Sequence, residues 1–141
     1  MTATASVEVG CDPQKAFEVF TNQIGRWWKR GTYYWVDPER AKEMRFIDGK
    51  LVEIYSEDDS LEIGRVVTWE PGSLLVFTWR MPHWPTDADT TVSVSFAASA
   101  SGSVVSISHS GWESVGPDGA ELGAGYGNGW AELLGFYREA L

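Results

Sequence analysis

Cysteine and histidine are scarce in this chain. The sequence holds one cysteine, Cys11, and two histidines, His83 and His109. A single cysteine excludes an internal disulfide, and because neither histidine is near it in sequence we interpret Cys11 as a structural residue. Zinc needs three or four ligands, and the sequence has no H-x-x-x-H or C-x-x-C spacing. We therefore expect no metal and no cofactor.

Positive charge and long apolar runs are also lacking. The 11 Lys and Arg residues stand against 20 Asp and Glu, and the formal charge of -9 opposes binding to phosphate backbones. No run of about 18 apolar residues occurs, and the N-terminal "MTATASVEVG" lacks the cationic start and apolar run of an export signal. We expect a cytoplasmic protein that binds no nucleic acid and does not insert into membranes.

The hydrophobic pattern indicates one α+β domain over residues 1–141. Residues 4–9, "TASVEV", alternate in the manner of a half-buried strand. Residues 11–24, "CDPQKAFEVFTNQI", then change to a helical period, with Asp12 suited to capping and Pro13 to the first helical position. The chain therefore starts with a strand followed by one or two short helices.

The middle and the end of the chain complete this arrangement. Residues 42–110 alternate as short strands separated by turns, and Asp48-Gly49 favours a two-residue hairpin turn. Strands this closely spaced favour an antiparallel sheet, because parallel pairs need long crossovers. Residues 125–141, "GYGNGWAELLGFYREAL", return to helical spacing. We expect this helix to cover the concave face of a curved sheet, and any gap between them to form an apolar cavity of roughly 300 to 1,000 Å³.

The order of elements resembles the START-like superfamily, also called SRPBCC, helix-grip or polyketide cyclase-like. Within it the chain is most similar to the family of homologues of the activator of a heat-shock chaperone ATPase. The resemblance implies a curved antiparallel sheet of about six or seven strands wrapped around a long C-terminal helix. It is carried by "CDPQKAFEVFT" after the first strand, Trp27-Trp28, Phe77-Thr78-Trp79, "HSGW" at 109–112, and "GYGNGWAELLGFY" on the last helix.

Aromatic residues are abundant, and eight tryptophans exceed what a core of this size usually needs. Trp27, Trp28, Tyr33, Tyr34 and Trp35 follow the first helix, at the expected open end of the domain. Side chains there can plug the core, line the mouth of a cavity or form a partner surface. Trp84 and Trp112 are further candidates for the cavity. The predicted ligand-binding residues are Trp28, Trp69, Phe77, Trp79, Phe96, His109, Tyr126, Trp130 and Tyr137.

His109 is the first candidate for acid–base chemistry. By parity it shares the inward face of its strand with Val105 and Ile107. A histidine in that place is either a core residue with its hydrogen bonds satisfied or a proton carrier whose unperturbed pKa lies near 6.5. Its neighbour Ser110 points to the opposite face, so the two do not form a nucleophile and base.

Arg65 is a cation on a face that otherwise looks apolar. It falls in register with Ile63, Val67 and Trp69. Its long side chain either reaches water at a strand end or edge, or stays buried against an anionic ligand or a carboxylate such as Glu53.

The leading hypothesis is a non-catalytic module that binds a hydrophobic or aromatic small molecule between sheet and helix. One alternative is an enzyme similar to polyketide cyclases or aromatases, in which His109 or Tyr126 moves protons. Under the leading hypothesis no residue is catalytic. The other is a co-chaperone-like interaction domain that uses exposed aromatic residues at 27–35. A homodimer through the sheet edge or through the aromatic segment is compatible with the sequence.

Overall fold

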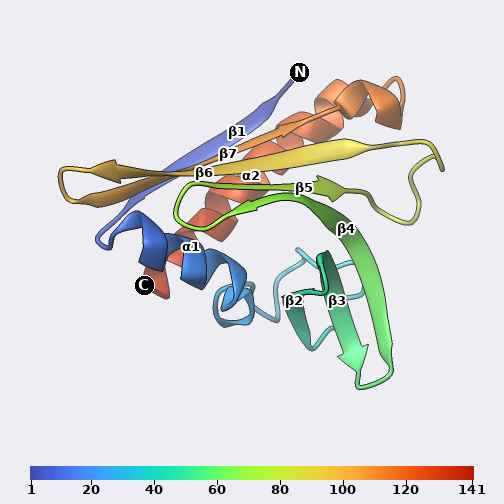
Figure 1. The fold of residues 1–141 in the computed structure, drawn as a ribbon. Coiled ribbons are helices and arrows are strands. Elements are labelled where there is room, and N and C mark those ends of the chain that lie inside the picture. Colours follow the sequence, from blue (N-terminus) through green and yellow to red (C-terminus); the bar gives the residue numbers. More distant parts are fainter.

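The computed structural model describes residues 1–141 and contains one seven-stranded antiparallel sheet around a long helix (Figure 1). The strand order is β1-β7-β6-β5-β4-β3-β2. The predicted helix-grip arrangement is confirmed. The elements in chain order are β1 (Ala3–Val9), α1 (Pro13–Thr21), the 3-10 turn η1 (Ile24–Arg26), β2 (Glu43–Ile47), β3 (Lys50–Ser56), β4 (Asp59–Glu70), β5 (Leu74–Trp79), β6 (Thr90–Ser99), β7 (Gly102–Ser110), the 3-10 turn η2 (Trp112–Val115) and α2 (Gly119–Glu139).

Local sequence signals explain two of the boundaries. The Asp12 side chain accepts a hydrogen bond from the backbone N–H of Lys15 at 2.8 Å, and Pro13 begins α1. Asp48 and Gly49 have φ values of 51° and 75°, so both occupy the left-handed region that a tight hairpin turn requires. The predicted cap and the predicted hairpin turn are therefore both confirmed.

The bend of the sheet lies at β4, the longest strand. Its register shifts against β3 and again against β5, between Val66 and Thr68. Such irregularities bend and twist a strand. Figure 1 shows β4 curving away from the other long strands and carrying the β2–β3 hairpin with it.

The register shift also corrects the predicted faces of β4. Val67 does not share the buried face of Ile63, because it falls at the shift and is 65% exposed. The Arg65 side chain is exposed and its Nε donates to Glu62 at 3.1 Å, so the alternative in which it is buried against Glu53 is wrong.

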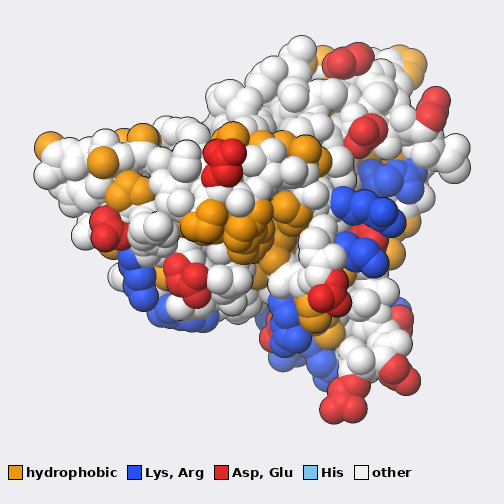
Figure 2. All heavy atoms as spheres, viewed as in Figure 1, with side chains coloured by type: hydrophobic (Ala, Val, Ile, Leu, Met, Phe, Trp, Pro, Cys, Tyr) orange, Lys and Arg blue, Asp and Glu red, His pale blue; other side chains and the backbone are white.

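Trp69, near the end of β4, is only partly covered. It packs edge-on against Phe17 of α1 and Phe46 of β2 and is 39% exposed. Figure 2 shows hydrophobic side chains gathered on the surface between α1 and the β2–β3 hairpin.

Helix α2 lies across the concave side of the sheet but contacts only part of it closely. It packs against β1, β7 and η2, and not closely against β2, β3 or β4. At its C-terminal end the Tyr137 hydroxyl donates to the carbonyl of Ala16 at 2.6 Å and ties α2 to α1. No helix has the length and apolarity needed to cross a membrane.

The start of α2 differs from the prediction. The helix begins at Gly119 rather than near Gly125, although glycine disfavours helices. Close packing explains this start, because a Cβ at Gly119 would stand 2.0 Å from the Trp112 carbonyl oxygen and one at Gly123 would stand 2.9 Å from the Trp112 ring. The glycines allow η2 and the first turns of α2 to approach each other.

Candidate ligand cavity

A cavity of about 600 Å³ lies between α2, the segment 28–36 and the inner faces of β2 to β5. Thirteen of its eighteen lining residues are hydrophobic. It forms where the sheet bends away from α2 at β4, because the side chains of the helix and of the sheet do not meet there. The helix and the sheet both contribute apolar side chains to its lining. The sheet contributes Met44, Glu53, Ile63 and Trp79, one from each of four successive strands.

Three tryptophans form one aromatic wall of the cavity. The ring centroids of Trp28, Trp79 and Trp130 lie 5.6 to 6.1 Å apart. Each indole N–H already has a protein acceptor: the Tyr34 carbonyl for Trp28, the Tyr126 hydroxyl for Trp79 and an imidazole nitrogen for Trp130. Because an indole has no other polar hydrogen, the wall offers a ligand apolar ring surfaces.

Four of the nine predicted ligand-binding residues line this cavity: Trp28, Trp79, Tyr126 and Trp130. The other five lie outside its lining, together with Trp84 and Trp112. Phe96 and Tyr137 pack against Phe20 at the α1 end, and Phe77 packs against Phe46. Trp84 and Trp112 pack edge-to-face with ring centroids 5.9 Å apart, and both contact Tyr126.

His109 is a fully buried member of a hydrogen-bond chain. Trp130 Nε1 donates to its Nδ1 at 3.0 Å, so Nδ1 carries no proton and the neutral ring is protonated at Nε2. Nε2 then donates to Thr90 Oγ1 at 2.9 Å, and the Thr90 hydroxyl donates to the Trp79 carbonyl. Burial lowers the pKa of His109 to about 3. The ring lies outside the cavity and both nitrogens are engaged, so the proposed proton transfer by His109 loses its geometric basis.

Most aromatic side chains of the segment after α1 are buried, and only Tyr33 is largely exposed. Trp27 is buried and its Nε1 donates to the Val19 carbonyl at 3.1 Å. Trp28 and Trp35 are also buried and line the cavity, whereas Tyr33 is 82% exposed. The segment therefore plugs the core with Trp27 and lines the cavity with the residues that follow.

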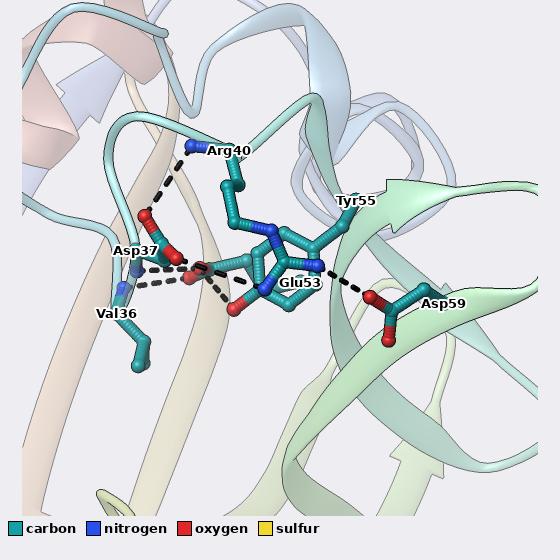
Figure 3. Close-up of polar contacts among 6 residues, drawn as sticks. All are labelled: Val36, Asp37, Arg40, Glu53, Tyr55 and Asp59. Carbon is teal, nitrogen blue, oxygen red and sulfur yellow. Dashed lines mark hydrogen bonds and ion pairs between the residues drawn. The ribbon is translucent and has the colours of Figure 1, made fainter.

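Glu53 is the main cavity residue that the sequence interpretation did not assign to the site. Its side chain is completely buried on β3. Figure 3 shows the groups that form hydrogen bonds with it. The backbone N–H groups of Val36 and Asp37 donate to its two oxygens at 2.8 and 2.9 Å, and the Tyr55 hydroxyl donates at 2.7 Å. Burial is the main cause, and the hydrogen bond to Glu53 the second cause, of a Tyr55 pKa well above its ordinary value. The Tyr55 hydroxyl therefore keeps its proton. Glu53 thereby fixes the segment 28–36 over the cavity.

Arg40 lies beside this carboxylate network without pairing with Glu53. Its guanidinium stacks 4.4 Å above the Tyr55 ring and forms ion pairs with Asp37 and Asp59 (Figure 3). The one guanidinium near Glu53 is therefore already balanced by two other carboxylates.

A second carboxylate lies at the outer edge of the cavity. The Tyr34 hydroxyl donates to Glu132 of α2 at 2.7 Å and links the aromatic segment to the helix. Burial and this bond raise the pKa of Tyr34 to about 12. Met81, Leu122 and Leu133 complete the apolar lining nearby. No cluster of three or more His, Cys, Asp or Glu side chains is arranged to hold a metal ion.

The curved sheet, the long terminal helix and the space between them define a helix-grip α+β domain. A family model described as "Activator of Hsp90 ATPase homolog 1-like protein" matches residues 11–136. The chain belongs to this family, as its resemblance in sequence indicated.

Solved structures of distant relatives have the same fold. Protein MLL2253 from Mesorhizobium loti is 16% identical with a TM-score of 0.71, covering 99% of this chain and 96% of its own. The solution structure of the Aha1 dimer from Colwellia psychrerythraea is 14% identical with a TM-score of 0.69, covering 100% and 96%. CalU16 from Micromonospora echinospora is 15% identical with a TM-score of 0.63, covering 99% and 73%. A search of curated proteins finds no match.

Proposed function

We propose that this protein binds a hydrophobic or aromatic small molecule in the cavity between α2 and the β2–β5 half of the sheet. The observation that carries the proposal is a space of about 600 Å³ with a mostly hydrophobic lining, which is the size and character of ligand sites in proteins. The three indole rings of the aromatic wall offer apolar surface to a ligand, and their N–H groups already have acceptors within the protein. The absence of a free histidine in the lining favours binding without turnover.

The test is a fluorescence titration with N-phenyl-1-naphthylamine, a neutral aromatic probe. Excitation of the protein tryptophans should give energy transfer to a saturably bound probe, because Trp28, Trp79 and Trp130 line the cavity. Aromatic and acyl compounds are then screened for displacement of the probe and for a rise in melting temperature.

Two variants of α2 locate the binding. Gly125 lines the cavity and Gly135 does not, and a Cβ at either position meets no atom within 4 Å. We expect Gly125→Phe to weaken probe binding at least tenfold and Gly135→Phe to leave it unchanged. Absence of saturable binding by every compound, or equal binding by both variants, would count against the proposal.

A further inference from the structure

The charged groups that line the cavity are all of one sign. Glu53 lies deep on β3 and Glu132 lies at the outer edge on α2, while no Lys, Arg or His belongs to the lining. A carboxylate or phosphate brought into this space would meet two negative charges and no counter-ion. Like charges in a partly enclosed, poorly solvated site repel strongly. The lining therefore disfavours fatty acids and other anionic ligands.

Glu53 is held in a way that leaves its charge without a cation. All three of its donors are neutral, two backbone N–H groups and the Tyr55 hydroxyl. No Lys or Arg nitrogen forms an ion pair with it. Its side chain is fully enclosed, so its charge acts on a ligand in the adjoining cavity through space. A buried charge without a counter-ion favours a cation in such a poorly solvated space.

The aromatic wall favours the same kind of ligand. The faces of indole rings carry negative electrostatic potential and attract ammonium groups, most strongly where water is excluded. Trp28, Trp79 and Trp130 line the cavity, and their N–H groups are engaged within the protein, so the rings meet a ligand without donating to it. The net charge of -9 adds a general attraction for cations during approach.

From these features we infer that the cavity selects an organic cation, a hydrophobic or aromatic molecule that carries an ammonium group. The ammonium end lies near the negative charges of enclosed Glu53 and of Glu132 at the cavity edge, and the apolar body stacks on the tryptophan wall. This inference rests on the proposed function and specifies its ligand class.

Three naphthalene probes of matched size test the charge preference by equilibrium dialysis: 2-naphthylmethylammonium, 2-naphthylmethanol and 2-naphthoate. We expect the ammonium probe to bind at least tenfold more tightly than the alcohol, and the alcohol more tightly than the carboxylate. Equal affinities, or a preference for 2-naphthoate, would overturn the inference. The proposed function would survive that result, since N-phenyl-1-naphthylamine is neutral and reports the cavity alone. Failure of all four probes would count against both.

A pair of variants assigns the preference to Glu53. Glu53→Gln and Glu121→Gln each remove one negative charge, and Glu121 is an exposed residue of α2 outside the lining. We expect Glu53→Gln to abolish the tenfold preference and Glu121→Gln to retain it. If the two variants changed the preference for the ammonium probe equally, the net charge of the protein would explain that preference, and a specific role for Glu53 would be contradicted. Should Glu53→Gln fail to fold, Glu132→Gln is expected to narrow the preference several-fold, and the ranking of the three probes by the unmodified protein still decides the inference.

Discussion

Mild acid should destabilise this protein through His109. The native ring is held neutral, because Trp130 donates to Nδ1 and a proton there would face another donor. The pKa of His109 in the folded protein is lowered to about 3 by burial, whereas in the unfolded chain it lies near 6.5. Between these values the unfolded state binds a proton that the native state does not. Stability contributed by neutral His109 is therefore fully present above pH 6.5 and is lost as the pH falls towards 3.

The size of the effect follows from the two pKa values. Each pH unit inside this window changes the free energy of unfolding by about 1.4 kcal/mol. From pH 6.5 to pH 5 the loss is therefore about 2 kcal/mol, a large part of the 5 to 15 kcal/mol that is typical of a domain. Most carboxylates stay ionised down to about pH 5, so this upper part of the window isolates the histidine.

The assay is urea denaturation of the protein and of His109→Gln at pH 7 and pH 5. Glutamine removes the titration, so the fall between the two pH values should be about 2 kcal/mol smaller in the variant, whatever stability it loses at pH 7. Nitrogen chemical shifts of the imidazole should also show a neutral ring protonated at Nε2 at pH 5. A protonated His109 at pH 5, or an equal fall in both proteins, would refute the reasoning.

Two further predictions concern the packing of β4 and the anchoring of Glu53. Gly64→Ala would place a Cβ 1.7 Å from the Thr78 carbonyl oxygen, so we expect it to lower the free energy of unfolding by about 3 kcal/mol. Gly135→Ala, which meets no atom within 4 Å, should instead raise it by up to about 1 kcal/mol in the same urea assay. Tyr55→Phe removes one of three donors from buried Glu53 and should cost about 1 to 3 kcal/mol, with faster amide exchange at Val36 and Asp37. Unchanged exchange there would contradict the anchoring role.

The order of elements was predictable because its signals are local. Asp12-Pro13 starts a helix and Asp48-Gly49 closes a hairpin whatever the rest of the chain does. The exposure of Val67 was not predictable from alternation, because the register shift arises only when β4 meets β5. The early start of α2 likewise depends on a neighbour, the Trp112 ring packed against Gly123.

Alternation along each strand predicted which side chains point inward, but not which of these inward side chains line the cavity. Phe77 and Trp79 both point inward from β5, yet only Trp79 reaches the cavity. Glu53 shares the parity of its buried neighbours Leu51 and Tyr55, and this pattern was a signal for an inward carboxylate. Its backbone donors come from residues 36 and 37, an irregular segment whose path no periodicity specifies.

Helix α2 meets the sheet tightly along β1 and β7 and leaves the bent wing of β2 to β4 free. The strands that hold α2 and the strands that shape the cavity therefore lie at opposite edges of one sheet. Substitutions on β2 to β4 can change the size of the cavity while the packing of α2 on β1 and β7 stays intact. Proteins with this fold can therefore come to bind different ligands without changes to the packing that stabilises the fold.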